Sequence, residues 1–196
     1  MVFRSVTGRV AALVSTIVSD WSRAAVRRVR RPAISPLRGT CWLVGGLIVS
    51  NGDVPIMAGR YLARLTQRPF VDLPELDFNS ERPRPDEIDL IAHADREILV
   101  GEAKCVDHIG KSVQNRNDAA AKFIRVAQFL HADQIVLVSS GANPWKATSV
   151  ETLTIAVKRA TWHFGPSPKI RLITGISTDN VVDVDANNQP WKSARV

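Results

Sequence analysis

Three charged side chains stand inside two otherwise apolar stretches of this sequence. Asp89 lies in the run 86–92, DEIDLIA, and Glu102 and Lys104 lie in the run 98–104, ILVGEAK. Two carboxylates and an amine held close together are suited to binding a divalent cation and activating a water molecule. This chemistry depends on the elements that position the three side chains.

Both stretches are predicted to be strands of one hairpin. Apolar side chains dominate each run, and residues 95–96 between them suit a two-residue turn. Such a turn sets two pairs of residues opposite each other, namely Asp89 with Glu102 and Glu87 with Lys104. Because side chains alternate along a strand, these four charged groups are expected on one face. The other face is expected to carry the apolar residues Ile88, Leu90, Leu99 and Ala103.

The paired carboxylates suggest a metal site. Two carboxylates about 5 Å apart repel each other, and ionising both is costly unless a cation lies between them. Oxygen ligands with room for water suit Mg²⁺, for which Mn²⁺ is a substitute, and Lys104 on the same face could orient the attacking water. A plainer alternative stays open, in which Glu87 and Lys104 form a cross-strand ion pair while Asp89 and Glu102 lie on a solvated face.

The spacing of these residues resembles that of a known family. Asp89, twelve intervening residues and then Glu102-Ala103-Lys104, each half in an apolar strand, is similar to the hairpin of the PD-(D/E)xK nuclease superfamily, in particular its Holliday-junction resolvase-like and Mrr-like members. The resemblance implies that Asp89, Glu102 and the backbone carbonyl of Ala103 bind Mg²⁺, and that Lys104 assists the water. It further implies a Mg²⁺-dependent deoxyribonuclease, in particular an endonuclease, that hydrolyses phosphodiester bonds in DNA.

The order of the predicted elements agrees with this resemblance. The family core runs helix, three strands, helix, strand. The matching elements are a helix at 56–67, strands at 70–78, 86–92 and 98–104, a helix at 117–131 and a strand at 134–140. A helix at 148–162, opened by a capping box of Thr148 and Glu151, and a strand at 170–176 follow as additions. We therefore expect an α/β fold with a restriction endonuclease-like core, in which helices flank a mixed central sheet.

The same family resemblance suggests further candidate site residues. Many family members carry an acid in the helix before the first strand, whereas residues 54–70 contain none. The acids that could compensate are Glu75, Glu81 and Glu87, and the glutamines that could follow the second motif strand are Gln114 and Gln128. Phosphates beside the site could be contacted by Lys111, Arg116, Lys122 and Arg125, although a solvated helix face explains these residues equally well.

The basic character of the chain belongs to its N-terminal arm. Residues 1–38 hold eight arginines against one acid, Asp20, which accounts for the formal net charge of +7. Apolar residues recur there at spacings of three and four, which predicts an amphipathic basic helix ending near Arg27, Arg28, Arg30 and Arg31. This arm could pack on its own domain or a second subunit, neutralise DNA phosphates, or contact a membrane surface. A nuclease-like domain at 39–177 and a polar tail at 178–196 complete the predicted organisation.

Three hypotheses for function remain. The first is the nuclease, and the second is a catalytically inactive nuclease-fold module that binds DNA or a partner protein. The third is an accessory protein whose N-terminal helix mediates oligomerisation or membrane contact. Expected partners are DNA and a second copy of the chain as a homodimer. No run approaches the roughly 20 apolar residues that span a bilayer, so stable membrane insertion is not expected, and two distant cysteines suit reduced thiols in a cytoplasmic protein.

Overall fold

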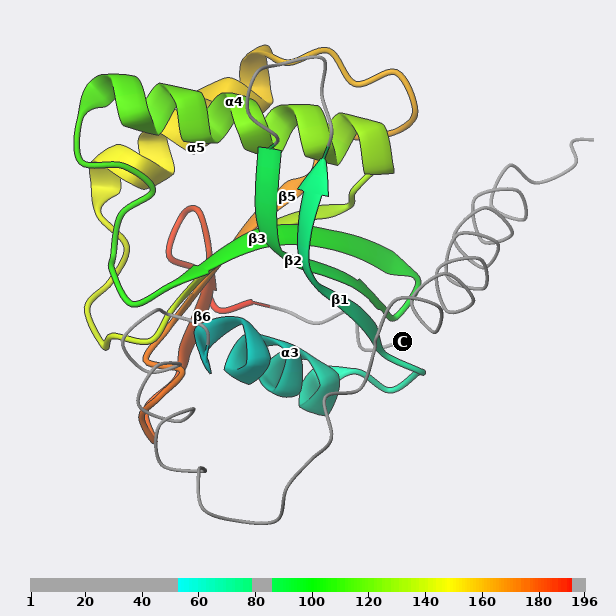
Figure 1. Ribbon diagram of the computed structural model, residues 1–196, viewed down its shortest axis with the longest axis vertical. Helices are drawn as coiled ribbons and strands as arrows, with labels where there is room; N and C mark the ends of the chain where they lie inside the picture. Colours follow the sequence, from blue (N-terminus) through cyan, green and yellow to red (C-terminus); the bar gives the residue numbers. More distant parts are fainter. Residues whose placement is uncertain (1–52, 79–85, 192–196) are drawn as a thin grey trace, which may run out of the picture. The chain divides into compact units, whose positions relative to one another are not determined.

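The computed structural model describes residues 53–78 and 86–191 (Figure 1). The chain divides into two units, Met1–Thr40 and Cys41–Val196, and every described residue belongs to the second unit. The expected basic helix, with Arg27, Arg28, Arg30 and Arg31, and the candidate Glu81 lie outside the described residues.

The described residues form a six-stranded mixed sheet with helices on both faces. In chain order the elements are α3 (Asp53–Leu65), β1 (Val71–Phe78), β2 (Asp86–Ala94), β3 (Glu97–Lys104), α4 (Val113–Leu130), β4 (Gln134–Ser139), α5 (Ala147–Arg159), β5 (Lys169–Thr174) and β6 (Val182–Asp185). The strands follow one another across the sheet from β1 to β6. Pairing is antiparallel from β1 to β3, parallel from β3 to β5, and antiparallel again between β5 and β6. The expected α/β fold with a mixed, helix-flanked sheet is confirmed.

Two apolar cores lie on the two faces of this sheet. α4 and α5 pack on one face and α3 on the other (Figure 1). Along β4, Ile135 and Leu137 belong to the core beneath α4 and α5, while Val136 and Val138 belong to the core beneath α3. A strand covered on both faces must be apolar throughout, which explains why β4 is buried along its whole length.

The β2–β3 hairpin has the predicted turn and the predicted register. Asp95 and Arg96 both have positive φ, at 49° and 73°, as a two-residue turn of type I′ requires. The turn pairs Ala94 with Glu97, and the same register continues to Leu90 opposite Gly101. Within the described residues, the β2–β3 ladder ends at that last pair, so the expected strand pairs Asp89 with Glu102 and Glu87 with Lys104 do not form.

In the part of β2 before Leu90, the side chains do not alternate between the two faces as in an ideal strand. Ile88 packs in the core with α4 and α5, whereas Leu90, two residues further on, packs in the core with α3. Strict alternation would place both on one face, so the expectation that Ile88 shares the face of Leu90 was wrong. The change falls where pairing with β3 has ended, while β2 stays paired with β1 as far as Asp86.

Gly101, at the last pair of the hairpin, is required for close approach. A Cβ atom at this position would lie 2.0 Å from the carbonyl oxygen of Val136 in β4. Only glycine therefore lets β3 pair with β4 at this point, immediately before Glu102.

Two helix boundaries differ from the sequence prediction. α4 begins at Val113, not at 117, because the Oγ of Ser112 caps the helix by accepting the N–H of Asn115 at 3.1 Å. α5 begins at Ala147 without a side-chain cap, so the predicted capping box was wrong. The polar side chain of this first turn serves tertiary structure instead, since the Oγ of Ser149 accepts the N–H of Ile109 at 3.3 Å.

The predicted polar tail contributes a strand. β6 pairs with β5, although no strand was predicted at residues 182–185. Its Asp183 binds the guanidinium of Arg171 at 2.6 Å and accepts a hydrogen bond from the hydroxyl of Tyr61 at 3.0 Å. Burial and the Asp183 carboxylate raise the pKa of Tyr61 to about 12. β6 is thus tied to β5 and to α3 by polar contacts that a local sequence pattern does not reveal.

Candidate functional site

Asp89 and Glu102 both lie where β2 and β3 separate. The Oδ2 atom of Asp89 accepts the N–H of Ala103 at 3.0 Å. In a continuing ladder a carbonyl of β2 would occupy that place, so the carboxylate substitutes for the missing strand pairing. In a strand the N–H and C=O of one residue point toward the same neighbouring strand, and the carbonyl of Ala103 therefore faces β2 as well.

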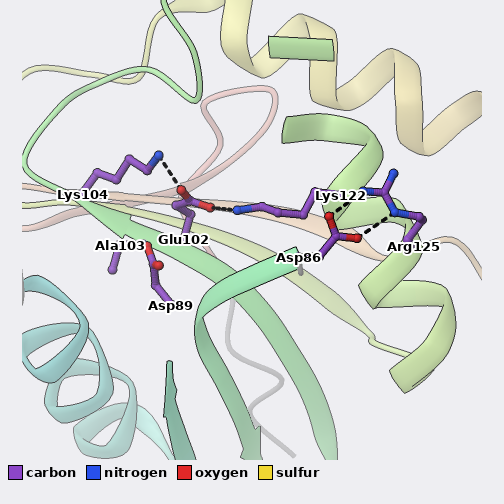
Figure 2. A network of polar contacts seen from close by, with 7 residues as sticks. All are labelled: Asp86, Asp89, Glu102, Ala103, Lys104, Lys122 and Arg125. Carbon is purple, nitrogen blue, oxygen red and sulfur yellow. Dashed lines mark hydrogen bonds and ion pairs between the residues drawn. The ribbon is translucent and has the colours of Figure 1, made fainter. Parts of the chain in front are cut away.

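Glu102 is a buried carboxylate held by two lysines. Its side chain is 7% exposed, and its two oxygens bind the Nζ of Lys104 at 2.5 Å and the Nζ of Lys122 at 2.8 Å. Figure 2 shows the three side chains in one line with Glu102 in the middle. A carboxylate withdrawn from water needs such partners, because an unpaired buried charge is very costly. The alternative in which Glu102 lies on a solvated face was therefore wrong.

The two carboxylates influence each other electrostatically. The pKa of Asp89 is raised by burial and, next, by the negative charge of Glu102. The N–H of Ala103 and the ammonium groups of Lys122 and Lys104 act in the opposite direction and lower it. Asp89 thus lies within electrostatic reach of the whole lysine–glutamate cluster, in a place where a further cation would favour its ionised form.

The two carboxylates do not share one face as predicted. Glu102 is directed to α4 through Lys122, whereas Asp89 lies in the gap between the strands, since the backbone N–H that it accepts lies in the plane of the sheet. Asp89 also lines a pocket of about 390 Å³ formed with α3 and the start of β1. Its other charged lining residues are Asp72 and Arg60. The gap is therefore open to solvent from the α3 side.

α4 holds the separated ends of both strands. Arg125 binds Asp86 at the start of β2 through two hydrogen bonds, of 2.9 and 2.7 Å. Residues three apart on a helix lie on the same side, so Arg125 reaches β2 while Lys122 reaches Glu102 in β3 (Figure 2). These two ion pairs fix α4 across the point where the strands part.

The other acidic candidates have different outcomes. Glu87 in β2 is exposed. Glu75 lies in β1 between the paired residues Pro74↔Leu90 and Leu76↔Ile88, which places its backbone across from Asp89, and its side chain lies outside the described residues. The sheet thus brings the backbone of Glu75 beside the site.

The two candidate glutamines are engaged elsewhere. Gln114 donates to the carboxylate of Asp118 at 2.9 Å in the first turns of α4, and Gln128 donates to the carbonyl of Thr161 at 2.9 Å near the end of that helix. The structure brings neither of them to Glu102.

Lys122, one of the predicted phosphate contacts, forms an ion pair with Glu102 instead. Its ammonium binds Glu102, and Arg125 binds Asp86, so neither is a freely solvated helix cation. Lys111 is exposed, and Arg116 is half-buried and donates to the carbonyl of Lys111 at 3.3 Å. These two remain at the start of α4, beside the loop that leaves Lys104.

Sequence reasoning missed that Lys122 belongs to the carboxylate cluster. A signal was present, because Lys122 follows Ala119 by three residues and precedes Val126 by four, and both pack on the core. This places Lys122 at the edge of the buried stripe of α4, where a long side chain can reach the sheet. Asp72, which lines the pocket beside Asp89, carried no such signal.

The oxygen groups around the gap are of a chemical kind that Mg²⁺ accepts. No three or more His, Cys, Asp or Glu side chains in the described part of the chain form a group that could hold a metal ion. Mg²⁺ is commonly bound by only one or two carboxylates, with water and substrate phosphate at its other positions. Asp89, Glu102 and the carbonyl of Ala103 are oxygen groups of that kind, and both oxygens of Glu102 are bound by lysines here.

No family model matches the chain, and comparison with curated proteins and with solved structures found no match. None of the helices in the described ranges is long and apolar enough to cross a membrane.

Proposed function

We propose that the chain is a metal-dependent nuclease that hydrolyses phosphodiester bonds in DNA, with a restriction endonuclease-like core of the PD-(D/E)xK kind. The observation that carries the proposal is the grouping of Asp89, Glu102 and Lys104 where β2 and β3 separate. The order α3, β1, β2, β3, α4, β4 supports it, because it agrees with the helix, three strands, helix, strand of that core.

Asp89, Glu102 and the Ala103 carbonyl are the groups that would hold Mg²⁺. The bound ion would supply polarisation of a phosphoryl oxygen and a lowered pKa for a bound water. Asp89 offers the oxygen that does not accept the Ala103 N–H, and it borders the pocket through which a substrate phosphate can enter. The ionised form of Asp89, which burial disfavours, is the form that binds a cation.

Lys104 is suited to act on the attacking water and the phosphate. Its side chain is 33% exposed, so its ammonium can reach a substrate while still close to Glu102. A fixed positive charge at this place stabilises the negative charge that develops on the phosphate oxygens.

DNA binding is proposed to involve positive charges outside the cluster. Lys111, just before α4, and Arg116, in its first turn, are the candidate phosphate contacts, and the arginines of the N-terminal arm add to them. Replacing Arg27, Arg28, Arg30 and Arg31 together with Gln should weaken DNA binding. It should also reduce the salt dependence, by a slope of about 0.9 for each phosphate that is no longer neutralised. An unchanged affinity and slope would exclude the arm from phosphate binding.

A second candidate is a nuclease-fold module that binds DNA or a partner protein without cutting it. One observation favours it: both oxygens of Glu102 are already neutralised by lysines, so the carboxylate is satisfied without a metal. In such a module the cluster would serve stability alone.

A cleavage assay separates the two candidates. Supercoiled, linear and branched DNA are incubated with the wild-type chain and Mg²⁺ or Mn²⁺, with chelator as the blank. The proposal expects cleavage that Asp89→Ala and Lys104→Ala abolish and that Lys158→Ala, at an exposed lysine of α5, leaves intact. Cleavage that survives both site substitutions would refute the assignment of the site. DNA binding without cleavage by the wild type would favour the second candidate.

A further inference from the structure

We propose that Lys122 is a positioning residue that occupies one oxygen of Glu102 in place of the divalent cation and releases this oxygen when the cation binds. The inference rests on the metal site of the proposed function, and it concerns how that site is kept in order without metal. It assigns to α4 a part in loading the site.

The geometry makes ammonium and metal competitors for the same atom. Both oxygens of Glu102 are in ion pairs, at 2.5 Å with Lys104 and at 2.8 Å with Lys122. The Glu102 side chain is buried, so a cation must approach its oxygens beside the two ammonium groups. A cation that takes Glu102 as a direct ligand therefore displaces or crowds at least one of the two ammonium groups.

Lys122 is the partner whose position is set by a separate element. It belongs to α4, which is held at the strand ends by the two hydrogen bonds between Arg125 and Asp86. Its ammonium lies 5.2 Å from the centre of the Phe123 ring, and its side chain is 19% exposed. The long stem of lysine can carry this ammonium outward to water or to a substrate phosphate without moving the helix.

Two effects of removing Lys122 are expected to reinforce each other. Without the competing positive charge, Glu102 binds a divalent cation more tightly, by about tenfold for one charge removed near a partly screened site. Without its ion pair the metal-free protein is less stable, and because the cation binds more tightly it raises the melting temperature by more than it raises that of the wild type.

The test measures Mn²⁺ binding by calorimetry on the full-length, chelator-stripped chain, with melting temperatures recorded alongside. Lys122→Met and Lys122→Gln should each bind Mn²⁺ about tenfold more tightly than the wild type. Lys122→Arg, which keeps the charge, should restore the wild-type affinity. Lys158→Met, a matched exposed lysine, should leave it unchanged, and Glu102→Gln should weaken binding strongly.

Every contrary result is decisive. Wild-type affinity in both Lys122→Met and Lys122→Gln would overturn the competition. Mn²⁺ binding that Glu102→Gln leaves unchanged, or no Mn²⁺ binding by any of the proteins, would overturn it together with the metal site. Tighter binding in the Lys122 variants without DNA cleavage by the wild type would keep the inference and refute the nuclease. DNA cleavage by the wild type, together with unchanged Mn²⁺ affinity in the Lys122 variants, would keep the nuclease and overturn the inference.

Discussion

Replacing Glu102 with Gln tests whether two lysines neutralise this buried carboxylate. The side chains have nearly the same shape, so the change removes the charge and leaves the packing in place. The amide oxygen can still accept a hydrogen bond from one lysine. The NH₂ group faces the other ammonium, and two donors cannot form a hydrogen bond with each other. Glu102→Gln therefore loses one charge-assisted hydrogen bond outright and weakens the second.

The expected destabilisation is about 2 kcal/mol. A hydrogen bond to a charged group contributes about 1.5–3 kcal/mol, and one such bond is removed while the other becomes charge-to-neutral. Lys104 and Lys122 are 33% and 19% exposed, so each can turn toward water, and this relief keeps the destabilisation below the value for a fully buried pair.

Urea denaturation in the presence of chelator measures this effect. The midpoint should fall while the denaturant slope stays constant, because the folded state keeps its compactness. Glu151→Gln, at an exposed glutamate of α5, is the control and should stay within about 0.5 kcal/mol of the wild type. A destabilisation in Glu102→Gln as small as that of the control would refute the assignment of both lysines to Glu102.

Three further predictions concern stability and titration. The raised pKa of Asp89 means that its ionised form costs stability, a cost absent below the unfolded value of 3.8 and growing as pH rises through the folded pKa. Asp89→Asn, which can still accept the Ala103 N–H, should melt higher than the wild type at neutral pH and equally below pH 3.8. Tyr61 is the one tyrosine of the chain, so tyrosinate absorbance reports it alone. The midpoint of this titration should lie at about 12 in the folded protein. The stability that Tyr61 contributes should be present below pH 10.0 and lost toward pH 12. Gly101→Ala forces a methyl group onto the Val136 carbonyl and should cost about 3 kcal/mol or more by denaturation.

Clear results would contradict each of these. Asp89→Asn melting below the wild type at neutral pH would show that the carboxylate is stabilised, not strained, by its surroundings. A tyrosinate midpoint near 10.0 in the folded state would show that Tyr61 is neither buried nor bonded to Asp183. A Gly101→Ala protein as stable as the wild type would show that β3 and β4 leave room for a side chain between them.

Local chemistry accounts for the parts of the fold that were predictable from sequence. The β2–β3 hairpin needed only two apolar runs and a turn, and a two-residue turn leaves one register, so Leu90 opposite Gly101 followed from counting residues. The helices and the remaining core strands were found because hydrophobic period is set by the element itself. The order of these elements follows from their order in the chain, and the proximity of Asp89 to Glu102 follows from the hairpin register.

Only the tertiary structure decided what surrounds the two carboxylates. The end of the ladder at Gly101 lets Asp89 accept the Ala103 N–H, and the docking of α4 brings Lys122 to Glu102. Contacts of this kind join residues far apart in the chain, and their energy depends on burial, which a local pattern does not specify. For the same reason the strand β6 went unpredicted, because a segment of only four residues becomes a strand only when a neighbouring edge, here that of β5, offers its hydrogen bonds. The sequence thus determined which groups can act, and the packing of α4 against the parted strands determined the charges that they meet.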